Sequence, residues 1–277
     1  MRCAVIQMRS GIDVEANIAA MTSLVQDAAG DGATYVQTPE MTGLLQKSRK
    51  ALFAEVKSDE DDLTFKAASN LAKELGIWLH IGSTPILRAD GKVANRAALF
   101  SPDGTRTATY DKIHMFDVDL DNGESWRESA IYAAGEAAFV TKLDHMKLGF
   151  GICYDVRFPD LFRQQALAGA HVLTAPAAFT RQTGQAHWHV LMRARAIENG
   201  AFMIAAAQGG IHEDTRETFG HSLIVNPWGQ IIAEVESEEP GYAIAEIDIK
   251  QSDQARAKIP NLKNDGKFIL QTTDDWS

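Results

Sequence analysis

Two segments far apart in the chain run from an apolar stretch into a proline in the same way. They read TYVQTPEMT at residues 34–42 and HVLTAPAAF at residues 171–179. Because proline lacks the backbone N–H that a central strand donates to its neighbour, each segment predicts a strand that ends at its proline. Each segment also follows a predicted helix and is followed by another helix and an apolar strand. This recurrence predicts two similar α/β halves.

The helices are predicted from apolar spacing and from capping residues. Asp13 is a predicted N-cap, and Gly76 ends a second helix. The apolar stripes of these two helices are Ile18, Met21, Val25 and Ala28, and then Leu63, Ala67, Leu71 and Leu75. Turn sequences such as SPDG and NPWG predict antiparallel hairpins, so the sheets should be mixed. Helices on one face of each half leave the other faces to pack together, which predicts an α/β fold: a four-layer α-β-β-α sandwich with two mixed sheets.

Chain length and apolar content fit one domain. The chain has 277 residues, of which 45% are hydrophobic, and this is enough for a single large core. The tail over residues 259–277 carries Ile259, Leu262, Phe268 and Ile269 without a regular apolar stripe. We therefore expect one domain over residues 1–277, with residues 259–277 as a C-terminal arm that packs across a subunit boundary.

The balance of charge narrows the class of ligand. The formal net charge is -10, with 27 Lys and Arg against 37 Asp and Glu. Nucleic-acid and anionic-membrane surfaces need clustered basic residues, which this composition argues against. The start MRCAVIQM does not resemble a signal peptide, and no apolar run reaches the roughly 18 residues of a membrane span. We expect a cytoplasmic protein that binds a small molecule, with no nucleic-acid or membrane partner.

One of the two cysteines stands at a chemically suggestive position. The stretch GFGICYDVRFPDL at residues 149–161 ends a predicted central strand on Cys153 and turns toward a helix. Such junctions are where open α/β sheets bind their ligands. Cys153 is then either a small buried apolar side chain or a nucleophile, and a nucleophile needs a base or a positive field nearby. Histidine is the usual base, but the histidines of this chain lie outside any recognisable cysteine-protease sequence. Glu40 and Lys112 each follow a predicted strand, as Cys153 does, and offer a carboxylate and an ammonium.

These strand ends carry a resemblance to a known family. TPEMTG with Glu40, YDKIHMFD with Lys112 and GFGICYDVRFPDL with Cys153 resemble, in this order, the Glu-Lys-Cys triad of the nitrilase superfamily, the carbon-nitrogen hydrolases. The similarity continues through ANRAALFSPDG, AHWHVLMRARAIE and GHSLIVNPWG and covers nearly the whole chain. It implies the four-layer sandwich, a homodimer or larger homo-oligomer, and neither a cofactor nor a metal.

The resemblance implies a role for each residue of the triad. Cys153 would attack the amide carbonyl, and Glu40 would take the thiol proton and later activate water. Such a base suits a pKa raised by a dry pocket. Lys112 and the backbone N–H of Tyr154 would stabilise the oxyanion. Without the resemblance, Lys112 could equally form a surface ion pair with a neighbouring aspartate.

A second glutamate is implied in the segment RESAIYAAGE. Glu128 matches the family position that supports Lys112 or positions the substrate, with Glu124 as a nearby alternative carboxylate. Both fall in residues 113–136, a stretch with little periodicity. Loops of this length inside a compact domain are usually functional, so we expect this one to form a wall of the site.

The residues after Cys153 resemble the amidase branch of the superfamily rather than the true nitrilases. The branch includes deaminated glutathione amidase and omega-amidase, and AHWHVLMRARAIE and AAAQGG favour the first over 2-oxoglutaramate hydrolysis by the second. The expected reaction releases ammonia from a small carboxylate-bearing amide. Substrate-binding candidates are Tyr154, Arg157, Phe179 and Arg181, although either arginine could be a surface group. Asp155 is expected to pair with Arg157 or a helix end.

A catalytically silent binding protein on the same fold is the alternative from another functional class. Such a protein would be free to lose a member of the triad, whereas this chain retains Glu40, Lys112 and Cys153. The sequence therefore favours a cysteine-dependent amidohydrolase acting on linear amides.

Overall fold

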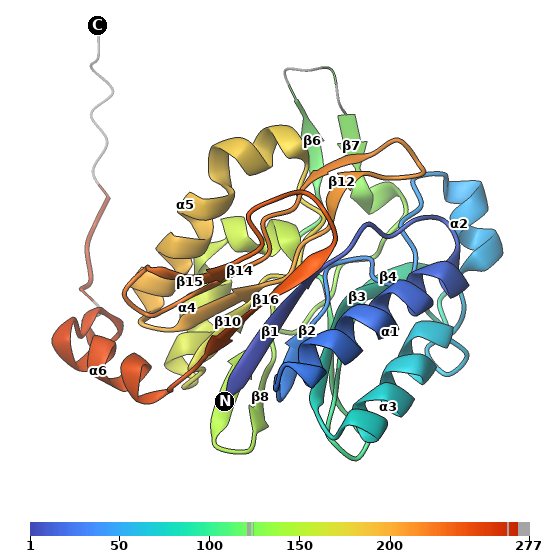
Figure 1. Ribbon diagram of the computed structural model, residues 1–277. Coiled ribbons are helices and arrows are strands. Elements are labelled where there is room, and N and C mark those ends of the chain that lie inside the picture. Colours follow the sequence, from blue (N-terminus) through green and yellow to red (C-terminus); the bar gives the residue numbers. More distant parts are fainter. Residues whose placement is uncertain (121–122, 124, 265, 271–277) are drawn as a thin grey trace, which may run out of the picture.

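Two six-stranded sheets packed face to face form the centre of the protein, and helices cover both outer sides (Figure 1). The computed structural model describes residues 1–120, 123, 125–264 and 266–270. In spatial order the first sheet contains β16 (Gly241–Glu246), β1 (Arg2–Gln7), β2 (Tyr35–Gln37), β3 (Trp78–Leu87), β4 (Val93–Phe100) and β5 (Arg106–Asp111). The second contains β15 (Ile231–Glu234), β14 (Leu223–Val225), β11 (Phe202–Ala205), β10 (Val172–Thr174), β9 (Met146–Gly149) and β8 (Val140–Leu143).

The two sheets have the same pattern of strand directions, as the recurring strand–proline segments predict. In each sheet a parallel trio, β1-β2-β3 or β9-β10-β11, carries antiparallel strands on both sides. The first sheet is completed by β16 from the C-terminal part of the chain, which pairs with β1. The two halves are therefore not consecutive in sequence.

Helices are found where the stripes and caps predict them. Asp13 accepts the Ala16 N–H at 3.0 Å and caps α1, while Gly76, with φ 64°, ends α3. The helices are α1 (Val14–Gly30), α2 (Arg49–Glu55), α3 (Leu63–Leu75), α4 (Pro159–Leu167), α5 (Arg181–Asn199) and α6 (Lys250–Lys258). Sequence patterns did not reveal α2 or α6. No helix in the described ranges has the length and apolar character needed to cross a bilayer.

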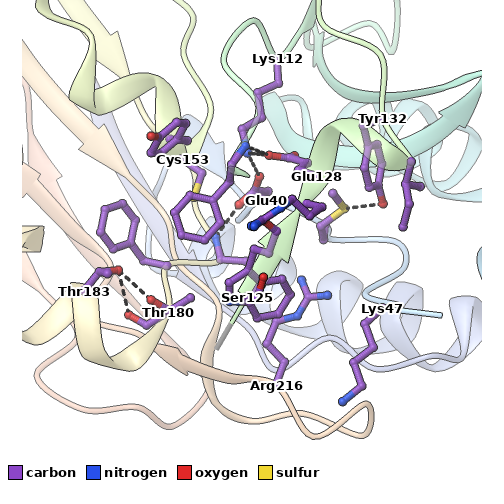
Figure 2. Close-up of a pocket in the computed structure, with 18 of the residues that line it drawn as sticks. Glu40, Lys47, Lys112, Ser125, Glu128, Tyr132, Cys153, Thr180, Thr183 and Arg216 are labelled. Atoms are coloured by element: carbon purple, nitrogen blue, oxygen red, sulfur yellow. Dashed lines mark hydrogen bonds and ion pairs between the residues drawn. The ribbon is translucent and has the colours of Figure 1, made fainter. Parts of the chain in front are cut away.

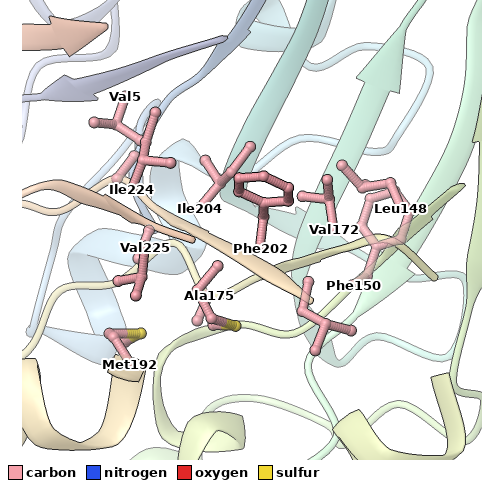
Figure 3. Packing of buried hydrophobic residues seen from close by; sticks show 14 of the residues in the cluster. Val5, Leu148, Phe150, Val172, Ala175, Met192, Phe202, Ile204, Ile224 and Val225 are labelled. Carbon is pink, nitrogen blue, oxygen red and sulfur yellow. The ribbon is translucent and has the colours of Figure 1, made fainter. Parts of the chain in front are cut away.

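The apolar core is divided by the first sheet into two clusters. The larger joins both faces of the second sheet: Val5 of β1 belongs to the same cluster as Phe150, Phe202 and Ile224 from the second half, and so do buried residues of α4 and α5 (Figure 3). The smaller joins the other face of the first sheet to α1 and α3. The stripe predicted for α3 is only partly right, because Leu71 is buried but Leu63 is exposed, and the helix buries Phe65, Ala68 and Ala72 instead. Since α4 and α5 contact the second sheet from outside, the predicted α-β-β-α order is confirmed.

Two short ribbons extend from the sandwich. The pairs are β6 (Asp117–Asp119) with β7 (Ser125–Arg127), and β12 (Gly209–Ile211) with β13 (Glu217–Phe219). The first ribbon lies inside residues 113–136, where the sequence predicted only a loop. Of the expected C-terminal arm, residues 265 and 271–277 lie outside the described residues. In its described part Phe268, Ile269 and Leu270 are exposed.

Candidate active site

Three strand ends bring the predicted triad together. Glu40 follows β2, Lys112 follows β5 and Cys153 follows β9, so residues from both sheets converge at one end of the sandwich (Figure 2). Gly82 in β3 permits this approach, because a Cβ there would lie 2.1 Å from the Thr38 carbonyl oxygen and 2.5 Å from Pro176. The two strand–proline junctions thus pack against one backbone position that has no room for a side chain.

Glu40 is buried and every oxygen of its carboxylate has a partner. Oε1 accepts from Lys112 Nζ at 3.0 Å and from Asn95 Nδ2 at 2.8 Å. Oε2 accepts the Ala178 N–H at 2.7 Å, and the carboxylate also shares a hydrogen bond with the Cys153 thiol. The base candidate is therefore held beside the candidate nucleophile by several hydrogen-bond donors.

Lys112 is equally buried and lies between two carboxylates. Its Nζ is 3.0 Å from Glu40 Oε1, and 3.0 and 2.8 Å from the two oxygens of Glu128. Glu128 Oε2 also accepts the Phe116 N–H at 2.7 Å. The structure therefore brings Glu128 to the position implied by the resemblance, whereas the alternative, Glu124, lies outside the described residues.

Asn95 is a site residue that the sequence reasoning missed. Its Nδ2 donates to Glu40 Oε1 and, at 3.2 Å, to Glu128 Oε1, so one amide bridges both carboxylates. It reaches them because β4 and β5 pair antiparallel, and the Lys112 N–H donates to the Asn95 carbonyl at 2.9 Å. The signal available in the sequence was a polar residue inside the strand-like stretch VANRAALF, which the structure buries fully.

The turn that carries Cys153 has a strained backbone and a dedicated anchor. Cys153 has φ 47° at the start of a 3-10 turn, Cys153–Arg157, and its N–H donates to the Pro176 carbonyl at 2.9 Å. A non-glycine residue in this region is uncommon and marks a constrained site. Tyr154 is the second residue of the turn, where a backbone N–H has no partner within the helix.

Asp155 anchors this turn instead of pairing with Arg157. Its Oδ2 accepts the Ile152 N–H at 2.9 Å and the Tyr110 hydroxyl at 2.8 Å. Its Oδ1 accepts from the His114 backbone N–H at 3.0 Å and lies 2.7 Å from Nδ1 of the same histidine. The helix-end role expected of Asp155 is thus present, and the pairing with Arg157 is not.

The protonation states follow from the charges. Burial would raise the pKa of the Glu40 carboxyl, but the Lys112 charge and hydrogen bonds from Cys153, Lys112 and Ala178 lower it below its usual value. Burial opposes the charge on Lys112, yet the Glu128 and Glu40 carboxylates raise its pKa well above its usual value. Burial and the Glu40 charge raise the pKa of the Cys153 thiol well above its usual value. The resting site therefore pairs a thiol with a carboxylate. The expected raised pKa of Glu40 is wrong, because the Lys112 charge and the hydrogen bonds to the carboxylate together outweigh the effect of burial.

A cavity of about 450 Å³ opens from these residues to the surface. Tyr154 and Phe179 line it, as predicted, and so do Phe116, Trp126 and Tyr132 from the segment expected to form a wall. Lys47 and Arg216, which the sequence reasoning did not single out, also line it (Figure 2). Its walls are mostly apolar and carry a smaller number of polar side chains.

Of the two arginines predicted to bind substrate, Arg157 lines the cavity and Arg181 does not. Arg157 lines the cavity, where its guanidinium lies 5.2 Å from the Phe179 ring centroid and 3.3 Å from His187 Nδ1. No carboxylate forms an ion pair with it in the described part of the chain. Arg181, in contrast, does not line the cavity, because Glu238, at 2.5 and 2.9 Å, and Glu217 hold it outside.

Metal-ligating side chains come together away from this cavity. Among the described residues, one group has suitable spacing: ligand atoms of His189, His221 and Glu234 lie within 4.8 Å of one another. Glu234 Oε1 already bonds both imidazoles, at 2.8 Å from His189 Nε2 and 2.9 Å from His221 Nδ1. None of the three lines the cavity.

Comparisons with known proteins agree with this geometry. Residues 2–257 match the model of the carbon-nitrogen hydrolase family. Over 265 residues the chain is 39% identical to deaminated glutathione amidase from Synechocystis, covering 94% of this chain and 96% of that protein. It is 34% identical to omega-amidase from Homo sapiens, covering 94% and 92%. The NitFhit protein of C. elegans has a similar structure, with TM-score 0.86 and 33% identity over 94% of this chain; the match spans 63% of that longer chain.

Proposed function

Because this chain belongs to the carbon-nitrogen hydrolase family, in the amidase branch of the nitrilase superfamily, we propose that it hydrolyses a linear amide through a thioester on Cys153. The observation that carries this mechanism is the double contact of Glu40. One carboxylate is hydrogen-bonded both to the thiol and to the ammonium of Lys112. A base and an electrophile are therefore already positioned around the nucleophile.

In the first half-reaction Cys153 Sγ attacks the amide carbon while its proton passes to Glu40. The thiol does not ionise before the attack, because burial and the Glu40 charge raise its pKa well above the usual value. Proton transfer is therefore coupled to attack. Negative charge then develops on the carbonyl oxygen, where an N–H of Lys112 and the Tyr154 backbone N–H stabilise it. The C–N bond breaks as Glu40 returns the proton to the departing nitrogen, leaving the thioester.

In the second half-reaction Glu40, again a carboxylate, removes a proton from water as the water attacks the thioester carbon. The C–S bond breaks, the carboxylic acid product leaves and the Cys153 thiol is restored. Asn95 and Glu128 support both steps by holding Glu40 and Lys112, each through a direct hydrogen bond.

The substrate we propose is deaminated glutathione, with 2-oxoglutaramate as the second candidate. The similarity to a deaminated glutathione amidase at 39% identity supports the first, and that to an omega-amidase at 34% supports the second. Both amides carry the same 2-oxoglutaryl group. Hydrolysis of deaminated glutathione releases cysteinylglycine, which differs from the ammonia expected from the sequence. Ammonia is the product only if 2-oxoglutaramate is the substrate.

Arg157 is the cation we assign to the carboxylate of this common acyl group. It lies in the turn that begins with Cys153, it lines the cavity, and the described residues offer it no carboxylate partner. Its guanidinium lies over the rings of Phe179 and Tyr154, which also line the cavity. A guanidinium in such a position binds a carboxylate through two parallel hydrogen bonds.

A comparison of the two amides tests the assignment of substrate. We expect kcat/KM for deaminated glutathione to exceed that for 2-oxoglutaramate by about tenfold, equivalent to about 1.4 kcal/mol of transition-state binding. Formation of 2-oxoglutarate is common to both reactions and provides one assay for both. A tenfold preference for 2-oxoglutaramate would reverse the assignment in favour of an omega-amidase.

We propose that the C-terminal arm joins two copies of this chain in a homodimer. The exposed Phe268, Ile269 and Leu270 in the described part of residues 259–277 would be covered by a second copy, since large apolar side chains rarely remain in water as a group. Light scattering of a chain ending at Lys258 should show loss of the dimer or aggregation. An unchanged dimer would refute a role for the arm in assembly.

We propose that the protein is cytoplasmic, because both of its thiols are free. Cys3 and Cys153 are both free and buried; Cys3 lies in β1 of the first sheet, and Cys153 begins the 3-10 turn that follows β9 of the second. A thiol that must remain reduced for catalysis suits a reducing compartment.

A further inference from the structure

Two cations line the cavity at the end away from the triad. Arg216 lies in the turn between β12 and β13, and Lys47 lies in the segment before α2. Figure 2 shows both on the opposite side of the cavity from Lys112, Glu128 and Cys153. The mechanism proposed above uses neither of them, so their presence in the cavity wall requires a separate explanation.

The charge at this end is only partly neutralised. Asp214 is the carboxylate that reaches Arg216, with its Oδ2 at 3.4 Å from Nη2. Arg216 Nε is buried, and no hydrogen-bond partner for it exists in the described ranges. Lys47 Nζ donates to the hydroxyl of Thr215 at 2.6 Å and pairs with no carboxylate of the described chain. One carboxylate against two cations leaves a net charge of about +1 in a protein whose overall charge is negative.

The turn is built to hold Arg216 in place. Asp214 Oδ1 accepts the Arg216 N–H at 3.0 Å, and the His212 N–H donates to the Arg216 carbonyl at 2.9 Å. Between them Thr215 has φ 70°, which is an outlier for a β-branched residue. Strain of this kind persists where the surrounding structure fixes it, and it is concentrated at functional sites.

A row of aromatic rings separates Arg216 from Arg157. The Arg216 guanidinium lies 4.8 Å from the Trp126 ring centroid, and Trp126 lies 6.5 Å from Phe116. Phe116 is 5.1 Å from Tyr154, whose ring lies 6.0 Å from the Arg157 guanidinium. The cavity therefore has a cation at each end and an apolar wall between them.

We propose that Arg216 and Lys47 form a second anion-binding subsite, which takes a terminal carboxylate in the amine half of the substrate. This inference rests on the proposed function, because Arg157 is there assigned to the carboxylate of the acyl half. An acyl group bound at Arg157 places the scissile amide at Cys153, so the departing amine extends toward the other end of the cavity. Arg216 lines the cavity, and a guanidinium can present two parallel N–H groups to a carboxylate.

The subsite discriminates between the two candidate substrates. 2-Oxoglutaramate releases ammonia and has no group that can reach Arg216. Deaminated glutathione ends in a glycine carboxylate on its amine half, separated from the scissile amide by a dipeptide. Its binding at Arg216 and Lys47 adds transition-state stabilisation that the shorter amide lacks, which makes this end of the cavity a determinant of specificity.

The test compares deaminated glutathione with its C-terminal carboxamide, which keeps the shape and removes the charge. For the wild-type enzyme we expect kcat/KM to be about tenfold or more higher for the acid, as for a lost charge-assisted contact. Arg216→Gln should reduce this ratio to near one, and Lys47→Gln should reduce it by a smaller factor. Arg181→Gln is the matched control, because Arg181 is held outside the cavity by glutamates, and its ratio should equal that of the wild type.

Two outcomes would overturn the subsite. One is a wild-type ratio near one. The other is an Arg216→Gln enzyme that loses activity toward acid and carboxamide equally, which a merely structural role predicts. Calorimetry with Cys153→Ala separates this inference from the proposed function, since it measures binding without turnover. Tighter binding of the acid by about tenfold supports the subsite even if no amide is hydrolysed, and equal Kd values refute it.

Discussion

Replacement of Cys153 by alanine is expected to lower kcat for amide hydrolysis by about four orders of magnitude or more, because the substitution removes the sulfur atom that would form the acyl intermediate. Glu40, Lys112 and Asn95 would remain bonded to one another, since those contacts do not involve the sulfur. The measurement is formation of 2-oxoglutarate from deaminated glutathione, with circular dichroism to show that the fold is retained.

Cys3→Ala is the matched control for this loss. Cys3 is fully buried in β1, and burial raises the pKa of its thiol to about 12, so it is chemically inert near neutral pH. Its replacement should leave kcat largely intact and cost only a little stability. Turnover that survives in the Cys153 variant, or disappears in the Cys3 variant, would contradict a nucleophilic role for Cys153.

Glu40→Gln is expected to reduce kcat by about 10³-fold, because the general base of both half-reactions is lost. The small fraction that does acylate should persist as a thioester, visible by intact-mass spectrometry as a 2-oxoglutaryl adduct on Cys153. Acid is a less suitable way to trap this species. The pKa of Glu40 lies below its usual value, so the carboxylate stays ionised as the pH falls and is protonated only below that depressed pKa.

Glu128→Gln is the matched control, since it removes the same charge from beside Lys112 but leaves Glu40 as base. Both variants should acylate more slowly, yet only the Glu40 variant should accumulate the adduct. Accumulation in both, or rapid clearance in the Glu40 variant, would show that another group activates the water.

Local chemistry was sufficient to predict most of the outer helices and the central strands. The Asp13 side chain caps its helix three residues on, and Gly76 adopts the left-handed conformation that ends α3. These are interactions over a few residues, and their signals are present in the sequence whatever the rest of the chain does. The strand–proline segments were reliable for the same reason, because the missing N–H of proline is a property of the residue itself.

Elements that depend on partners elsewhere were not predicted. The strand β16 completes the first sheet by pairing with β1, which lies about 240 residues earlier, as in the pair Arg2 and Glu246. The helix α6 has little apolar periodicity, and the ribbon of β6 and β7 is held by a register that residues 113–136 do not reveal on their own. Tertiary context decides such segments.

The same division applies to the candidate site. The sequence by itself determined the chemical groups, because the Glu, Lys and Cys each follow a strand in a recognisable motif, and it placed a wall of the site in residues 113–136. Only the tertiary structure decided how those groups are ionised and supported. The Lys112 charge and the hydrogen bonds to Glu40 together reverse the expected shift in its pKa, and Asn95 bridges two carboxylates from another strand. It also decided which arginines face the cavity, excluding Arg181 and including Arg216. The physical reason is that a motif specifies which atoms are available, whereas pKa values, ion pairs and cavity walls depend on distances between atoms that are far apart in the chain.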